Sequence, residues 1–209
     1  MVKIEPFEKH TNQYEAWFEQ NPFVYQSELR AVKALLPEKG EGFEIGVGSG
    51  RFAAPLHISI GIEPSQKMGK IAQGRGIDVV CGSAESIPFY DSQFDFALMV
   101  TTICFLDDIK LAFKETYRVL KTDGQLVIGF VDRESPLGKH YQKHKNKSVF
   151  YKMAHFYSTD EIVSYLKETG FKKINFIQTI FKPLKEIDKI EPIRKGHTKG
   201  SFVVVSGIK

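Results

Sequence analysis

Apolar and polar residues follow two alternating periods along this chain. Short apolar runs, typical of buried strands, lie at residues 42–45, 58–62, 77–81, 94–100 and 125–131. Around and between them, apolar residues recur at helical spacing, at residues 24–36, 51–56, 65–75 and 107–121. Strands that alternate with helices are typical of an α/β fold, so we expect a mainly parallel sheet.

The C-terminal part of the chain predicts a different arrangement. Ser158-Thr-Asp-Glu161 has the spacing of a capping box, which opens a helix that we expect to end at Gly170. Two further strands, residues 171–181 and 201–208, follow with no helix between them, so we expect an antiparallel hairpin. Its connection, residues 182–200, is long and charged, and we expect it to be mobile. The whole pattern predicts a seven-stranded, mostly parallel sheet with a C-terminal antiparallel hairpin and helices on both faces.

Composition and charge narrow the class of protein. The chain has 209 residues, 42% hydrophobic and 26% charged, which favours one globular domain and excludes disorder as the dominant state. A net charge of +4 is too mild to indicate nucleic-acid binding by itself. The most apolar run, residues 97–106, is too short to span a membrane, and no apolar leader opens the chain. We therefore expect a cytoplasmic protein without a membrane segment.

The two cysteines, Cys81 and Cys104, lie in separate apolar stretches and match no zinc-binding spacing. We expect both to be reduced thiols, and we expect no metal site.

A glycine cluster follows the first predicted strand. The residues are Glu44-x-Gly46-x-Gly48-x-Gly50, and Glu63 ends the next strand 17 residues after Gly46. Strand, glycine loop, helix, strand and acidic residue is the order of a nucleotide site, in which the carboxylate accepts hydrogen bonds from a ribose diol. The same carboxylate would repel the 2′-phosphate of NADP. Arg51 stands where the dinucleotide fingerprint needs a third glycine, which argues against NAD as well.

Four segments together carry a family resemblance. Residues 43–52 (Phe-Glu-Ile-Gly-Val-Gly-Ser-Gly-Arg-Phe) resemble the first motif of the class I S-adenosylmethionine-dependent methyltransferases, closest to the small-molecule group typified by the quinone-biosynthesis enzymes. Residues 82–89, 94–98 and 115–124 resemble the later motifs in the family's order and spacing. The resemblance covers roughly residues 40–132 and implies a Rossmann-like fold with S-adenosylmethionine as the cofactor.

The resemblance also implies roles for particular residues. The loop at residues 46–50 would hold the methionine part of the cofactor, and Glu63 would hold the ribose. Residues 83–85 would hold the adenine edge, with Ile62 and Ile87 as apolar walls. Ser83 stands where the family usually has Asp, which puts one hydrogen bond to adenine in doubt. The predicted cofactor-binding residues are Glu44, Gly46, Gly48, Gly50, Glu63, Pro64, Ser83, Ala84, Glu85 and Thr101.

The acceptor side should come from the remaining segments. We expect a single methyltransferase domain with an N-terminal helical lid (1–40), a cofactor-binding half (41–132), a substrate cap (133–157) and a C-terminal helix with the hairpin (158–209). Methyl transfer from a sulfonium mainly needs alignment in a dry pocket, so no obvious catalytic triad is required. The candidate catalytic residues are Tyr14, Thr101, His140 and Tyr141.

The predicted cap is strongly basic. It has no Asp or Glu between residues 135 and 159 but carries five lysines, at positions 139, 143, 145, 147 and 152. They either form a solvated face or rim a pocket for an anionic or aromatic small molecule. The leading hypothesis is therefore a small-molecule methyltransferase, as a monomer or a homodimer.

Two alternatives stay open at this stage. One is an RNA or other nucleic-acid methyltransferase, which the basic cap favours. The residues after the fourth predicted strand, Thr101-Thr-Ile-Cys104-Phe105, argue against this alternative. They stand where DNA amino-methylating enzymes carry a proline-containing motif. The other is a non-catalytic module that binds S-adenosylmethionine.

Overall fold

The computed structural model describes residues 4–209. Its helices are α1 (Glu5–Lys9), α2 (Thr11–Gln20), α3 (Pro22–Leu35), α4 (Gln66–Gly74), α5 (Ile109–Val119), α6 (Pro136–His144) and α7 (Thr159–Thr169). Its strands are β1 (Gly42–Ile45), β2 (Ile60–Ile62), β3 (Asp78–Val80), β4 (Phe94–Val100), β5 (Leu120–Val131), β6 (Lys172–Thr179), β7 (Arg194–Lys195) and β8 (Phe202–Ile208). Short 3₁₀ turns lie at Ala54–Leu56, Ile103–Phe105, Lys145–Lys147, Tyr151–Met153 and Leu184–Glu186.

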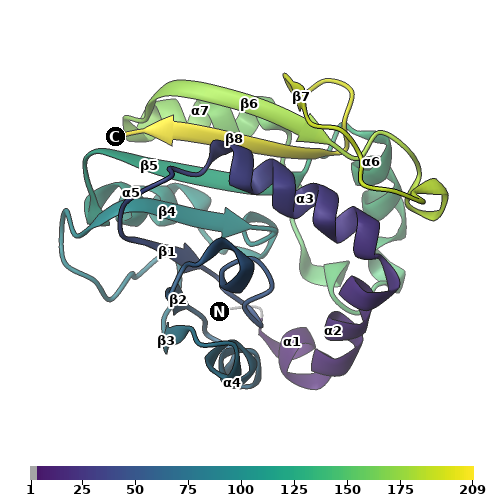
Figure 1. Ribbon diagram of the computed structural model, residues 1–209, viewed down its shortest axis with the longest axis horizontal. Coiled ribbons are helices and arrows are strands. Elements are labelled where there is room, and N and C mark those ends of the chain that lie inside the picture. The colour runs from purple at the N-terminus through teal and green to yellow at the C-terminus, as the bar shows by residue number, and fades with distance from the viewer. Residues whose placement is uncertain (1–3) are drawn as a thin grey trace.

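One sheet organises these elements (Figure 1). The strand order is β3-β2-β1-β4-β5-β8-β6-β7, parallel from β3 to β5 and antiparallel from β8 onward. The chain order reverses between β1 and β4, which is the place where open α/β sheets bind ligands at the carboxyl ends of their strands. Helices α1, α2 and α6 lie beyond those ends (Figure 1).

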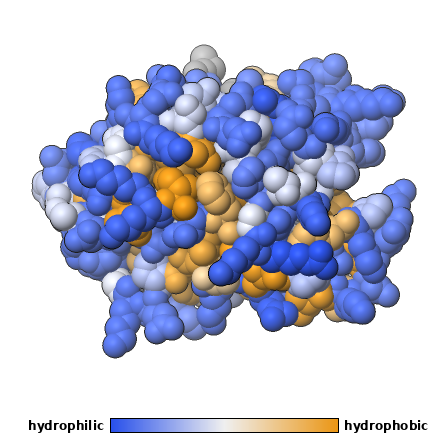
Figure 2. All heavy atoms as spheres, turned by 90° about the horizontal axis from the view of Figure 1, so that it is seen from above, coloured by the Kyte–Doolittle hydropathy of each residue, from blue (hydrophilic) through white to orange (hydrophobic). Residues whose placement is uncertain are grey.

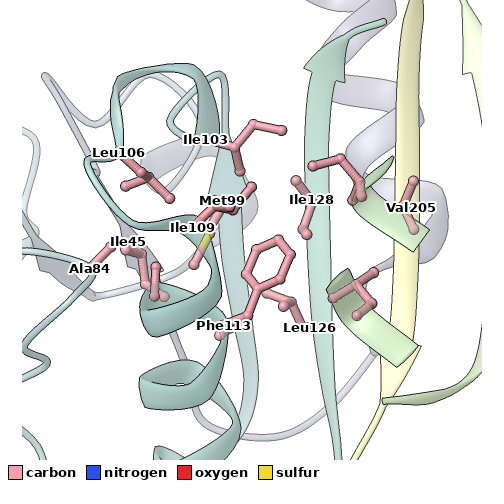
Figure 3. Close-up of a cluster of buried hydrophobic side chains, with 14 of the residues drawn as sticks. Ile45, Ala84, Met99, Ile103, Leu106, Ile109, Phe113, Leu126, Ile128 and Val205 are labelled. Atoms are coloured by element: carbon pink, nitrogen blue, oxygen red, sulfur yellow. The ribbon is translucent and has the colours of Figure 1, made fainter. Parts of the chain in front are cut away.

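Helices cover both faces of the sheet, and the strands alternate their side chains between two cores. On one face α5 and α7 pack on Ala97 and Met99 of β4, and Phe113 of α5 reaches toward Leu126 and Ile128 of β5 (Figure 3). On the other face α3 and α4 pack with the intervening residues of β4, which are Phe96, Leu98 and Val100. A strand buried on both faces explains why residues 94–100 read as a continuous apolar run.

The predicted α/β fold with helices on both faces is confirmed, with one strand more than expected. The hairpin of β6 and β8 forms as predicted, with Ile177 opposite Val204. The capping box at Ser158 and Glu161 opens α7.

The connection at residues 182–200 is more ordered than the sequence suggested. It contributes β7, which pairs with β6, and it buries Glu191, whose carboxylate accepts a hydrogen bond from the Phe181 N–H at 2.5 Å. The expectation of a mobile connection did not anticipate these contacts, because a charged composition does not reveal which carboxylate finds a backbone donor.

The helix expected at residues 51–56 is wrong. Only a single 3₁₀ turn forms, at Ala54–Leu56, with Pro55 in its first turn. Pro55 has no N–H to donate to the Arg51 carbonyl, and the Tyr25 hydroxyl donates to that carbonyl instead. The rings of Phe18 and Tyr25 pack on Phe52, with centroids 6.5 and 5.7 Å away, so the N-terminal helices cover the face that a longer helix would have covered.

The polarity of the surface and the lengths of the helices are those expected from the composition, which predicted no membrane segment. Seen from above the view of Figure 1, hydrophilic residues dominate the surface and apolar residues gather in a band across its centre (Figure 2). None of the helices within residues 4–209 is long and apolar enough to cross a bilayer.

Candidate active site

A cavity of about 470 Å³ opens at the carboxyl ends of β1, β2, β4 and β5. Its volume lies in the range usual for small-molecule sites. The glycine loop and the residues that follow β2, β3 and β4 form one side of the lining. Helices α1 to α3, α6 and the segment at residues 148–151 form the other side.

The glycine loop and Glu63 are joined at the cofactor side of this cavity. The Glu63 carboxylate accepts hydrogen bonds from the backbone N–H of Gly48 and of Ser65, both at 2.8 Å. Its side chain is only 9% exposed, and burial raises its pKa to about 7 against the effect of those two hydrogen bonds. Each oxygen keeps a further lone pair and the residue lines the cavity, so Glu63 can still accept from a ligand.

Two threonines shape the turn after β4. Thr101 has φ +53°, a conformation that β-branched residues rarely adopt, and it lines the cavity. Its N–H donates to the Gly129 carbonyl at 2.8 Å, which helps to hold the strained backbone. Thr102 Oγ1 lies 3.2 Å from the Ile45 carbonyl, and a Cβ at Gly46 would lie 2.7 Å from that same oxygen. Gly46 is therefore required for the loop to pass so close to β4.

Helix α2, in the segment predicted to be a lid, is tied to the glycine loop by an ion-pair network. Glu15 of α2 pairs with Arg51 at 2.6 Å and with Arg75 at 2.5 Å, and Arg75 also donates to the Ser49 carbonyl. The Arg51 guanidinium is therefore paired with helix α2.

Aromatic side chains form much of the remaining lining of the cavity. Tyr141 and Tyr151 lie with ring centroids 4.9 Å apart, and Phe150 lies 6.1 Å from Tyr14 of the lid. Burial raises the pKa of Tyr14, of Tyr141 and of Tyr151 above the ordinary tyrosine value. These hydroxyls therefore stay protonated near neutral pH and can act as hydrogen-bonding groups, not as bases.

The structure brings most of the predicted site residues to this one cavity. All four catalytic candidates line it, as do Gly46, Gly48, Glu63, Pro64, Ser83, Ala84, Glu85 and Thr101. Glu85 also accepts a hydrogen bond from the Asp107 N–H at 2.9 Å, which ties the loop after β3 to the start of α5.

Four residues expected at the cofactor do not line the cavity. Gly50 packs behind the loop against Ile77, and Glu44 is buried under the loop with Oε2 unpaired. Burial raises the pKa of Glu44 well above its usual range. Ile62 and Ile87 belong to the core between the sheet and α5 and do not line the cavity. Ile45, Met68 and Leu106 supply apolar lining instead.

The charge of the lining is opposite to that of the basic cap. No lysine or arginine among residues 4–209 lines the cavity, whereas four carboxylic residues do, namely Glu28, Glu63, Glu85 and Asp107. Lys139, Lys143, Lys147 and Lys152 are exposed, and Lys145 donates to the Ala154 carbonyl at 3.3 Å. The cap lysines therefore do not form the inner rim of an anion pocket, which removes the support for an anionic acceptor.

Sequence reasoning missed Glu28 and Tyr151. Glu28 lies in the buried stripe of α3 with Val24 and Ala31, so a carboxylic residue inside an apolar stripe was the signal that could have found it. Tyr151 carried no signal beyond its place among the aromatic residues of the cap.

The residues present fit the cofactor that the motifs imply. Gly48 has φ +56°, and a Cβ there would project to 3.5 Å from the Tyr14 hydroxyl, so a glycine keeps the loop accessible from the cavity. The lining contains carboxylic residues and no lysine or arginine of residues 4–209, which suits a cationic sulfonium.

Comparison with known proteins agrees with this geometry. Residues 43–128 match the family model described as a methyltransferase domain. The chain is 46% identical over 203 residues to an uncharacterized protein of Methanocaldococcus jannaschii, MJ1123, covering 97% of this chain and 98% of that protein.

Two further matches carry functional descriptions. A crystal structure from Thermotoga maritima, described as a SAM-dependent methyltransferase and possible histamine N-methyltransferase, is 53% identical, covers 99% of both chains and has a TM-score of 0.97. A demethylmenaquinone methyltransferase from Thermotoga maritima is 34% identical over 110 residues, which is 47% of each chain.

Proposed function

Because the chain belongs to the S-adenosylmethionine-dependent methyltransferases, we propose that it methylates a small, neutral or cationic molecule with an aromatic or apolar body, bound in the cavity described above. The observation that carries this proposal is the lining itself, which is aromatic and acidic and includes no lysine or arginine of residues 4–209. An anionic acceptor would meet acidic side chains and no lysine or arginine of the described residues in this lining.

The cofactor side of the proposal rests on the loop and on Glu63. S-adenosylmethionine supplies a methyl group on a positively charged sulfur, which leaves as a neutral thioether when the acceptor attacks. We assign the N–H groups of residues 46–50 to the methionine part and Glu63 to the ribose, with residues 83–85 at the adenine. Thr101 lines the cavity between the loop and the aromatic end, where its strained backbone fixes the turn beside the reacting groups.

The acceptor side rests on the aromatic residues and the lid. Tyr14, Tyr141 and Tyr151 supply protonated hydroxyls and ring faces, which orient an aromatic body and exclude water. The two described relatives support a small acceptor, since one is named for a quinone precursor and the other for a small aromatic amine. His140 lines the mouth, where it is exposed enough to pass a proton to solvent.

The test is a turnover screen read by release of S-adenosylhomocysteine. The panel contains histamine and other aromatic amines, phenols, reduced quinones, aromatic carboxylates and total RNA. Turnover on amines, phenols or quinols, with carboxylates inert, supports the proposal. Turnover on RNA alone would identify a nucleic-acid methyltransferase. Cofactor binding without turnover on any member would indicate a binding module.

A further inference from the structure

One carboxyl group in the cavity has no partner. Glu28 lies in the middle of α3, is 5% exposed and lines the cavity. No hydrogen bond or ion pair reaches its carboxyl from residues 4–209, and desolvation is the only influence on its pKa, which it raises to about 8. Glu63, the other deeply buried carboxyl of the lining, is held by two backbone N–H groups. The Glu28 carboxyl accepts no such hydrogen bond from the backbone of residues 4–209.

The described side chains around Glu28 offer its carboxyl no positively charged partner. Tyr141 of α6 and Tyr151 are the titratable groups that interact electrostatically with Glu28. Both hydroxyls are neutral near pH 7. Tyr14, His140 and His144 also line this cavity, but none of them hydrogen-bonds or pairs with Glu28. A buried carboxyl without a partner is costly to keep, because its oxygens have lost their hydrogen bonds to water and have gained none from the protein. Its position facing an enclosed space therefore points to a partner that comes from outside the chain.

We propose that Glu28 is the specificity-determining residue for a basic nitrogen on the methyl acceptor, so that the acceptor is a small amine with an aromatic or apolar body. The inference rests on the proposed function, whose acceptor class it narrows. An amine N–H donates to the Glu28 carboxyl, and the body of the acceptor packs against the rings of Tyr141 and Tyr151. A ring face beside the ammonium would add a favourable cation–π contribution. A phenol or quinol would leave the carboxyl without a cation.

The test compares amines with their matched alcohols. Phenethylamine is paired with phenethyl alcohol, and tryptamine with tryptophol, and binding to the protein saturated with S-adenosylhomocysteine is measured by calorimetry. The wild type should bind each amine at least tenfold more tightly than its alcohol. The Glu28→Gln variant should lose most of that preference, while its affinity for S-adenosylhomocysteine stays within twofold of the wild type. Glu38→Gln removes an exposed carboxylate just beyond the same helix and should keep the preference.

The outcomes separate this inference from the proposed function. An amine preference that survives in Glu28→Gln, or a wild type that prefers the alcohols, would overturn the role of Glu28. If phenols or quinols are methylated and amines are not, the proposed function stands and the inference fails. If only RNA is methylated, both fail. Glu28→Leu serves as a second uncharged variant should the glutamine variant misfold, and it should lose the same preference.

Discussion

The substitution Glu63→Ala tests two roles of one carboxylate, one in the fold and one in cofactor binding. In the free protein Glu63 satisfies the N–H groups of Gly48 and Ser65 at 2.8 Å, and in the proposed complex it also accepts from the ribose. Alanine removes both functions at once. The effects on folding and on cofactor binding have different sizes, so they can be measured apart.

The effect on stability is a balance of opposing terms. Leaving two N–H groups without an acceptor costs about 1–3 kcal/mol each where they are buried from water. Alanine also removes a group whose ionisation costs free energy in the folded protein. Raising the pKa from 4.5 to about 7 corresponds to about 3 kcal/mol, at about 1.36 kcal/mol per pH unit. The free energy of unfolding at pH 8 should therefore change by less than about 3 kcal/mol, and the variant should fold.

The effect on the cofactor has no such compensation. Hydrogen bonds to a charged acceptor contribute about 1.5–3 kcal/mol, which corresponds to a loss of roughly 10- to 150-fold in affinity. Calorimetric titration with S-adenosylhomocysteine measures this loss, and urea denaturation measures the stability. Asp95→Ala is the matched control, because Asp95 also accepts a backbone N–H at 2.8 Å, from Glu41, but lies away from the cavity. Unchanged affinity in Glu63→Ala, with the control behaving as expected, would refute the ribose assignment.

Three further expectations follow from the geometry. The pKa of Glu63 is raised to about 7, and only the ionised form offers both oxygens as acceptors. The affinity for S-adenosylhomocysteine should therefore fall about tenfold between pH 8 and pH 6. A calorimetric affinity that does not change with pH would contradict this. Gly50→Ala should lower the free energy of unfolding by about 2–4 kcal/mol in urea denaturation, because φ is +82° and the added Cβ would lie 2.5 Å from Ile77 Cδ1. The double change Lys143→Glu with Lys145→Glu should leave KM for the acceptor within twofold in the turnover assay, because neither side chain lines the cavity; a larger, salt-sensitive rise would restore the anionic-rim hypothesis.

The sequence was most informative where a residue type has one physical use. Gly46 and Gly48 adopt positive φ angles beside the cavity, and Glu63 ends its strand facing the same loop, as the spacing predicted. The apolar stripe of residues 107–121 and the capping box at Ser158 likewise formed helices close to the expected bounds. Each of these signals is local, since it depends on neighbours within one turn or one strand.

The rest depended on contacts between distant segments. Arg51 could not be assigned from its neighbours, because its partner Glu15 lies 36 residues away on the lid. The cap lysines were counted correctly, but composition does not say which side of a helix faces a cavity. Glu28 looked like one charged position in an amphipathic helix, and only the packing of α3 under the cap turned it toward an enclosed space.

The placement of neighbouring residues on α2 has a kinetic consequence. Tyr14 faces the cavity, while Glu15 on the same turn holds Arg51 and Arg75 beside the glycine loop. The preceding helix carries Phe7, whose ring lies 5.0 Å from Phe105 and 5.5 Å from Phe150. Helices α1 and α2 therefore contact both the glycine loop and the aromatic residues of the cavity. Changes that loosen these two helices should therefore raise the exchange rates of cofactor and acceptor together.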